Sequence, residues 1–270
     1  MKTAACCMTR NEERDIVEWV LYHAWTGFDT VVVFENRSTD RTRERLDSLS
    51  GLIDIRIFDW QYEYHPGHFN AFAKCMNDFR DEFDWMALFD HDEFFVPVKH
   101  ANIKDYLASM DAHASIAVNW MMYGSSGHVA YPDGLITQEM LQRAPASFSP
   151  NRFVKSIVRP KESVGCTSSH NMDMKDGIET VDVKGDPVQW LKRGKTIAPI
   201  GLEDTARFHH YFVRSQAHWE KRMAIPFNAA KRADTKFEVY DRNDVYDPIV
   251  VDKFGDVLAR IAAFKAEHGV

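Results

Sequence analysis

The sequence predicts an open, mostly parallel α/β fold, and two patterns lead to this prediction. Short apolar runs alternate with helical stretches through the first 98 residues. One apolar run leads directly into Asp90-His91-Asp92-Glu93, and open α/β sheets bind ligands at the carboxyl ends of their strands. The chain has 270 residues, 45% of them hydrophobic, so it can bury a sizeable core. We expect one domain over residues 1–270, with a regular half (1–98) and an elaborated half (99–270).

The first half alternates predicted strands and helices, an order that favours parallel strands joined by right-handed crossovers. Residues 30–34 are a β-branched run, and alternating isoleucines fill residues 53–57. Ser38 and Thr39 can cap the second helix. The expected strands span residues 3–8, 30–34, 53–57 and 85–89, and the expected helices span 12–25, 38–50 and 69–79.

The second half has fewer regular elements and many glycines and prolines between them. Ser215 can cap a helix over residues 215–224, and Pro248 suits the first position of a final amphipathic helix. The expected strands span residues 115–122, 152–158 and 205–212. The first half thus builds the sheet, and the second half elaborates one side of it.

Composition limits the classes of function. The formal net charge is −7, which disfavours nucleic acid as a partner, because such binding needs a basic face. The four cysteines form no C-x-x-C pair, so we expect a reducing compartment without structural zinc. No stretch approaches the roughly 20 apolar residues of a membrane span, and no signal peptide is evident. We therefore expect a cytoplasmic protein without a transmembrane segment.

The acidic run is the strongest candidate for a site. On extended backbone, Asp90 and Asp92 would project to the same side, where their charges repel. A hard divalent cation such as Mg²⁺ or Mn²⁺ would offset that repulsion. The alternative is a solvated acidic turn after a strand, because an isolated D-x-D pattern is common.

Polar residues also follow the first two expected strands, and they should share an edge with the acidic run. Carboxylates, amides and helix N-termini at that edge suit a base, a ribose and a phosphate. Turn and cap chemistry is the alternative for Asn36 and Asp40. No G-x-G-x-x-G or P-loop sequence is present. The candidate donor-binding residues are Thr9, Asn11, Glu12, Glu35, Asn36, Asp40 and Asp90.

Together these motifs resemble glycosyltransferases of the family 2-like and family 92 kind, which have the GT-A fold. The resemblance covers about residues 3–225, and it depends on the order and spacing of pieces that are weak alone. Two residues depart from the family pattern: Arg214, where lysine is more frequent, and Glu35, where aspartate is. The matching pieces are Asn11-Glu12, Glu18-Trp19, Tyr22-His23, Glu35-Asn36, Ser38, Asp40, Phe89-Asp90-x-Asp92-Glu93-Phe94, residues 152–157, 209–215 and 219–221.

The resemblance implies transfer of a sugar from a nucleotide-diphosphate donor to a glycan or other hydroxyl acceptor, with inversion. A Mn²⁺ or Mg²⁺ ion would stabilise the leaving diphosphate, with Asp90, Asp92 and His210 as expected ligands. Adjacent strand residues face opposite ways, so only one of His209 and His210 should reach the metal. Inversion also needs a general base, for which the candidates are Glu203, Asp204 and His170, with Asp133 a weaker choice.

We expect residues 120–128, His170 and residues 209–221 to border the cleft as its acceptor side. Trp120, Tyr123 and Trp219 could stack on a sugar ring, although aromatic side chains also fill cores. The cations that could neutralise a diphosphate or an acidic acceptor are Arg152, Lys155, Arg214 and Lys221.

Three other functions fit parts of the pattern. A nucleotidyltransferase would also use carboxylates, but it normally carries a glycine-rich basic loop after the first strand, where this chain has Thr9-Arg10-Asn11-Glu12. A metal-dependent phosphohydrolase would show metal-ligand spacing among its histidines, which is not recognisable here. A non-catalytic sugar-binding protein could share the same fold.

Overall fold

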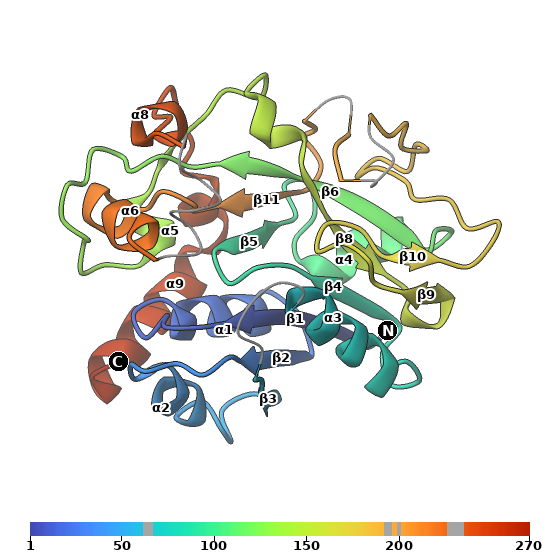
Figure 1. The fold of residues 1–270 in the computed structure, drawn as a ribbon, viewed down its shortest axis with the longest axis horizontal. Helices are drawn as coiled ribbons and strands as arrows, with labels where there is room; N and C mark the ends of the chain where they lie inside the picture. Colours follow the sequence, from blue (N-terminus) through green and yellow to red (C-terminus); the bar gives the residue numbers. More distant parts are fainter. Residues whose placement is uncertain (62–66, 192–195, 199–200, 226–234) are drawn as a thin grey trace.

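The computed structural model describes residues 1–61, 67–191, 196–198, 201–225 and 235–270. In these residues an eight-stranded sheet has the order β3-β2-β1-β4-β8-β6-β11-β5 (Figure 1). Its strands are β1 (Thr3–Thr9), β2 (Thr30–Glu35), β3 (Ile55–Asp59), β4 (Trp85–Leu88), β5 (Glu93–Val96), β6 (Ser115–Met122), β8 (Val154–Val158) and β11 (Arg207–His210).

The four strands expected in the first half are confirmed as a parallel set. β1 pairs in parallel with β2 and with β4, and β2 pairs in parallel with β3. The β-branched run in β2 is buried along its whole length, as suits a strand covered on both faces. In the register of the pair, Thr9 at the end of β1 lies opposite Glu35 at the end of β2. The carboxyl ends of these strands therefore share one edge.

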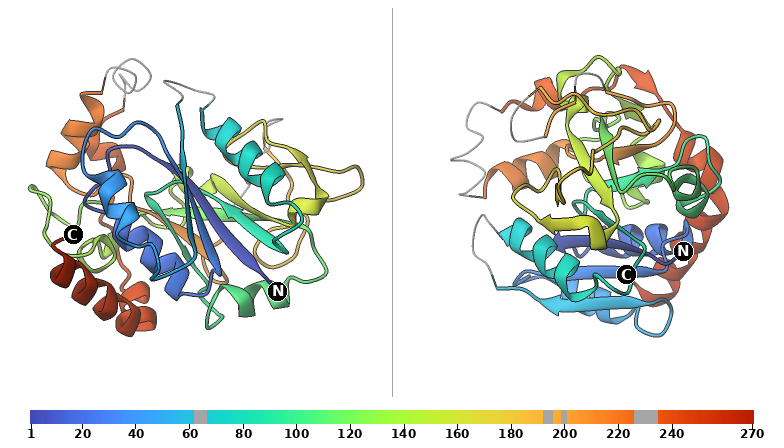
Figure 2. Two further views of the ribbon diagram at one scale, coloured as in Figure 1. Left: turned by 90° about the horizontal axis from the view of Figure 1, so that it is seen from below. Right: turned by 90° about the vertical axis from the view of Figure 1, so that its right-hand side faces the viewer.

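Helices cover both faces of the parallel strands (Figure 2). Ala5 and Cys7 of β1 pack toward α1 (Ile16–Trp25), α4 (Ile103–Ser109) and α9 (Ile249–His268). Ala4 and Cys6 pack toward α3 (Gly67–Asp78) on the other face. This alternation follows from the two-residue repeat of a strand. Buried apolar side chains on both faces fix the position of the carboxyl edge.

Two helices begin later than the sequence predicts. α1 begins at Ile16, not residue 12, because Asn11 adopts a left-handed φ of 57° and the Glu12 N–H donates to Thr42 Oγ1 at 2.7 Å. α2 spans Thr42–Asp47, and the predicted capping by Ser38 and Thr39 is wrong. Ser38 and Thr39 instead bond to Asn11, at 2.9 and 2.7 Å. Contacts between the two loops therefore replace local capping.

The second half extends the same sheet. β8 pairs antiparallel with both β4 and β6, β11 runs parallel to β6, and β5 pairs antiparallel with β11. Residues 89–92 connect β4 to β5, which is four places away in the sheet order. Four strand spacings of about 4.8 Å exceed the reach of so short a turn. The sheet therefore curls, and β5 returns over the end of β4.

Helix α6 (Gln216–Met223) has the predicted cap, since Ser215 Oγ accepts the His218 N–H at 3.1 Å. Pro248 is the N-cap residue of α9, one place before the first helical position where the sequence predicted it. In the described residues, no helix combines the length and apolarity needed to cross a bilayer. The shorter elements are α5 (Ile136–Glu139), β7 (Gln142–Arg143), η1 (Ser149–Arg152), η2 (Pro160–Glu162), β9 (Ser163–Gly165), β10 (Asp173–Met174), α8 (Phe237–Tyr240) and β12 (Val245–Tyr246).

Candidate active site

The acidic run forms a closed turn rather than extended backbone. β4 ends at Leu88, and the Glu93 N–H donates to the Asp90 carbonyl at 3.1 Å. The Glu93 carboxylate bends back to accept the Asp90 N–H at 2.9 Å. The prediction that Asp90 and Asp92 lie on extended backbone is therefore wrong. The turn directs the two carboxylates toward different elements, so each meets its own cation.

Asp90 contacts the middle of the sheet. Its Oδ2 accepts from Lys155 Nζ on β8 at 2.9 Å, and His68 Nε2 lies 3.9 Å from its Oδ1. Burial by itself would raise the pKa of Asp90, but Lys155 and His68 outweigh it and hold that pKa below its ordinary value. Asp90 is therefore charged at neutral pH. Lys155 was expected to neutralise a diphosphate or an acidic acceptor, and the structure buries its ammonium group between Asp90 and Glu93.

Asp92 contacts residues of β11 and α6, in the second half of the chain. Its side chain is 2% exposed, with Arg222 Nη1 at 2.8 Å from Oδ2 and His210 Nε2 at 3.5 Å from Oδ1. Burial would raise the pKa of this carboxyl, but His210 and Arg222 hold it well below its ordinary value. Asp92 is thus an ionised carboxylate, nearly closed off from solvent.

Asp92, Glu93 and His210 form a group that fits a divalent cation. Each offers one ligand atom, and these atoms all lie within 4.8 Å of one another. Glu93 Oε1 is buried without a hydrogen-bond partner, so an oxygen donor remains for a cation. Two carboxylates and an imidazole suit Mn²⁺ and also accept Mg²⁺. This candidate group contains two of the predicted ligands, Asp92 and His210, and it contains Glu93 instead of the predicted Asp90.

The two adjacent histidines of β11 face opposite ways, as their spacing requires. His209 points into the core, where its Nε2 accepts from Arg207 Nε at 2.9 Å and lies 3.3 Å from the Tyr123 hydroxyl. Burial and Arg207 lower the pKa of His209 well below its ordinary value. His210 faces the acidic turn, with its ring 4.3 Å from that of Trp120. Only His210 can therefore contact a cation at Asp92.

The residues predicted to bind the donor gather where β1 and β2 end. Thr9 and Glu35 lie opposite each other, and Asn36 is buried beside them. Much of this polar chemistry holds the loops in place: Glu35 Oε1 accepts the Ser38 N–H at 2.6 Å. Asp40 likewise accepts from Thr42, and Asn11 accepts from Thr39. The predicted edge therefore exists, and several of its side chains already have partners within the protein.

Glu12 links this edge to the acidic turn. Its Oε1 lies 2.8 Å from Nε2 of His91, the middle residue of the D-x-D sequence, and its Oε2 accepts from Arg214 Nη1 at 2.7 Å. Burial would raise the pKa of Glu12, but Arg214 and His91 lower it below its ordinary value. Arg214 is itself buried, adopts a left-handed φ of 59°, and also pairs with Asp15 at 2.5 Å. Glu12, held by Arg214, therefore stabilises the position of His91 in the acidic turn.

His170 and Trp120, which the sequence predicts on the acceptor side, lie together. The two rings are 5.3 Å apart, and the Trp120 ring also contacts that of His210. His170 Nδ1 lies 3.0 Å from the Val154 carbonyl, which can only accept, so Nδ1 carries the proton and Nε2 keeps its lone pair. Burial and nearby Lys155 lower the pKa of His170 to about 4. His170 is therefore neutral at pH 7.

Other predicted residues lie elsewhere. Tyr123 and Trp219 are 1% and 6% exposed and pack inside the protein, so neither offers an open face to a sugar. Glu203 pairs with Arg143 at 2.9 Å. Asp204 lies at the surface between Lys99 and Lys184. The ion pairs of Glu203 and Asp204 are with residues outside the acidic turn.

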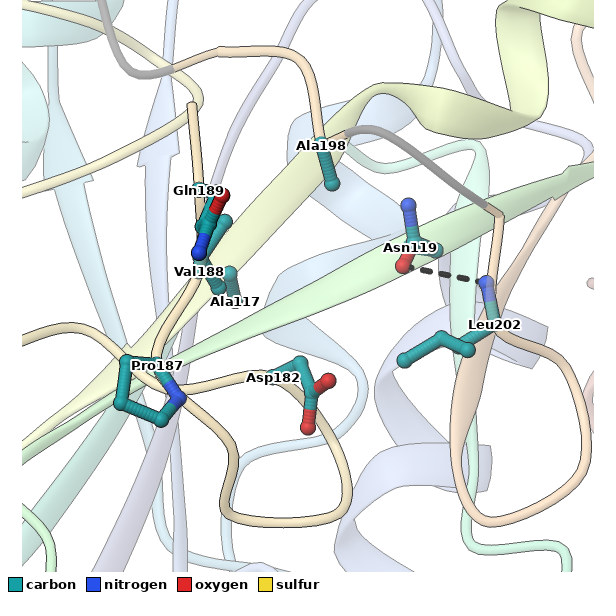
Figure 3. A pocket seen from close by; sticks show the side chains of 8 residues that line it. All are labelled: Ala117, Asn119, Asp182, Pro187, Val188, Gln189, Ala198 and Leu202. Atoms are coloured by element: carbon teal, nitrogen blue, oxygen red, sulfur yellow. Dashed lines mark hydrogen bonds between the residues drawn. The ribbon is translucent and has the colours of Figure 1, made fainter. Parts of the chain in front are cut away.

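A cavity of about 210 Å³ lies beside β6 (Figure 3). Its wall is mainly apolar, and the Leu202 N–H donates to Asn119 Oδ1 at 3.2 Å. Its lining residues are Ala117, Asn119, Asp182, Pro187, Val188, Gln189, Ala198 and Leu202. The side chains of the acidic turn do not line this cavity.

The fold and site define a class: an α/β protein with a carboxylate–histidine group that could hold a divalent cation, at the carboxyl edge of its sheet. The family model for glycosyltransferase family 92 matches residues 3–221, and the chain belongs to that family. The family and the GT-A-like α/β fold expected from the resemblance are thereby confirmed.

The chain is also similar to individual known proteins. A family 92 protein of Arabidopsis thaliana is 26% identical over 64% of this chain, and one of Ricinus communis is 27% identical over 66%. The chain spans 32% of the length of each of these relatives. Residues 1–349 of S. aureus TarS superpose with a TM-score of 0.43 at 15% identity, covering 97% of this chain and 83% of that one. Mycobacterium tuberculosis glucosyl-3-phosphoglycerate synthase gives a TM-score of 0.39 at 12% identity, covering 71% of this chain and 73% of that one.

Proposed function

We propose that this chain transfers a sugar from a nucleotide-diphosphate donor to a hydroxyl acceptor, with inversion and with Mn²⁺ or Mg²⁺ as cofactor. The observation that carries the proposal is the group of Asp92, Glu93 and His210 at the carboxyl edge of the sheet in a family 92 chain. A cation held there would supply Lewis-acid stabilisation of the leaving diphosphate. The nucleoside would lie over Thr9, Glu35 and Asn36, where β1 and β2 end.

Among the candidate bases, the geometry favours His170. In an inverting displacement, the acceptor oxygen bonds to the anomeric carbon as the bond from that carbon to the phosphate oxygen breaks. The acceptor proton must leave at the same time, and the His170 Nε2 lone pair can take it. His170 lies beside Trp120, whose ring also contacts His210. Glu203 and Asp204 are instead paired with arginine or lysine.

The four cysteines are free thiols. Three of them are buried in the core, and reduced cysteines are typical of proteins kept in a reducing compartment. We therefore propose the cytoplasm as the place where this chain works.

The first test is nucleotide binding, measured by thermal shift with UDP, GDP and free nucleoside triphosphates, each with and without Mn²⁺. A nucleoside diphosphate at 100 times its Kd stabilises the folded state by about 2.7 kcal/mol, which raises Tm by roughly 5–10 °C. We expect this shift with UDP or GDP only when Mn²⁺ is present. Stabilisation by triphosphates alone would favour nucleotidyl transfer, and no shift with any nucleotide would favour a sugar-binding protein.

The second test removes a ligand charge with Asp92→Asn, which preserves the shape of the side chain. We expect the variant to lose the Mn²⁺-dependent shift. Asp244→Asn is the matched control, because Asp244 pairs with Arg242 at the surface. Metal-dependent affinity that stays the same in Asp92→Asn would refute the ligand assignment.

A further inference from the structure

Arg222 is a cation that the sequence did not single out. It pairs with Asp92, one of the candidate metal ligands. It lies near the end of α6, and its Nη1 donates to Asp92 Oδ2 at 2.8 Å and to the Phe212 carbonyl at 3.3 Å. The guanidinium also lies over the Phe212 ring, 4.3 Å from its centre. A divalent cation at Asp92 would need that same carboxylate. Arg222 and the metal would therefore either share Asp92 or compete for it.

The charges of the site favour movement of Arg222 when a metal binds. Three carboxylates, Asp90, Asp92 and Glu93, face two close cations, Lys155 and Arg222. Formally this leaves one negative charge, so a divalent cation would turn the cluster positive. Like charges a few ångströms apart repel strongly in a buried site. An arginine next to a bound metal would therefore be more stable if it contacted an anion instead.

The other two buried cations are less able to move. These are the two cations near the acidic turn: Lys155 is fully buried between Asp90 and Glu93, and Arg214 is 1% exposed and held by Glu12 and Asp15. The Arg222 side chain is 22% exposed and lies on the last turns of a helix. A metal–oxygen bond is only about 2.1 Å long, so a phosphate on the metal would lie within reach of a guanidinium near Asp92.

We propose that Arg222 is the internal counter-ion of the metal-free site and the diphosphate-binding residue of the loaded site. In this account Arg222 neutralises Asp92 until the divalent cation arrives, and its planar fork then binds the donor diphosphate. The inference rests on the proposed function, because it requires a divalent cation at Asp92.

The account predicts two changes of opposite sign in Arg222→Gln. Without nucleotide, Mn²⁺ should bind about 3- to 10-fold more tightly, because Asp92 no longer has to release an arginine. With saturating Mn²⁺, whichever of UDP and GDP binds the wild type should bind at least 10-fold more weakly. Mn²⁺ binding is measured by electron paramagnetic resonance of the free ion, and nucleotide binding by calorimetry.

Two further variants make the result specific. Arg242→Gln removes an arginine from a surface pair with Asp244, and it should change neither affinity. Arg222→Lys keeps the charge without the fork, so Mn²⁺ affinity should stay near that of the wild type while diphosphate affinity falls. If Arg222→Gln weakens the binding of both Mn²⁺ and nucleotide, or leaves Mn²⁺ affinity unchanged, the proposed move of Arg222 from Asp92 to the diphosphate is refuted. If the wild type binds no Mn²⁺, the proposed function fails at its metal site, a result distinct from failure of that move alone.

Discussion

Lys155→Met tests whether the buried charges beside the acidic turn are balanced as the structure shows. Lys155 is fully buried, 2.9 Å from Asp90 and 3.7 Å from Glu93. The ammonium group lies closer to Asp90 than to Glu93, so Asp90 is the main charge that Lys155 neutralises. Methionine preserves most of the length of the side chain and removes only the ammonium group.

The expected cost follows from the burial of the pair. Removing one partner of a buried ion pair leaves an uncompensated charge, which typically costs about 3–5 kcal/mol. We expect the lower end, about 3 kcal/mol, because Asp90 is 27% exposed and can gain some hydration. The double variant Lys155→Met/Asp90→Asn should recover part of this loss, since it removes both charges together.

Urea unfolding followed by circular dichroism measures this loss. For a chain of this size, with a slope of about 3 kcal/mol per molar urea, the midpoint should fall by about 1 M. Lys161→Met is the control, because Lys161 and Asp81 are 60% and 90% exposed and lie 3.7 Å apart. Such a surface pair contributes less than about 1 kcal/mol. A loss in Lys155→Met no larger than that of the control would refute our description of the charges.

Two other predictions concern histidines. We expect His170→Gln to reduce turnover by roughly 10²-fold or more at nearly unchanged stability, and full activity with the wild-type donor and acceptor would leave Glu203 and Asp204 as the candidate bases. Burial lowers the pKa of His23 to about 3, so the unfolded chain, with a histidine pKa of about 6.5, binds a proton first as pH falls. Between pH 6.5 and 5 this residue should therefore cost about 1.6 kcal/mol of stability. In His23→Gln that part of the pH dependence should vanish in urea titrations, and an identical pH profile would show that His23 is not held neutral.

The sequence predicted the parallel strands because their signals are local. The β-branched run in β2 and the apolar run that ends at Leu88 each report burial without knowledge of the rest of the chain. The carboxyl edge follows from strand direction alone. The two helix starts were misplaced because distant contacts decide them: Ser38 bonds across to Asn11 instead of capping its own helix.

The partners of the acidic turn could not be read from the sequence. The sequence marked Lys155 as a candidate cation, but no local pattern pairs it with Asp90, 65 residues away. No local pattern marks Arg222, which lies 130 residues from Asp92. Glu93 was visible in the acidic run, but its place in the ligand group depends on a turn that extended backbone would not form. The alternation of strand side chains predicted that only one of His209 and His210 faces the acidic turn, and the structure shows that it is His210.

The path of the sheet sets the order in which the site is completed during synthesis. The acidic turn leaves the ribosome early, but the strand that carries Lys155 and the helix that carries Arg222 follow long after it. β4 then lacks its partner β8, and β5 lacks its partner β11. Until those segments appear, water must solvate the carboxylates of the turn. The charged centre is therefore completed only after residue 222 is made, although its acidic turn is made much earlier. Pairing between segments so far apart in the sequence slows folding.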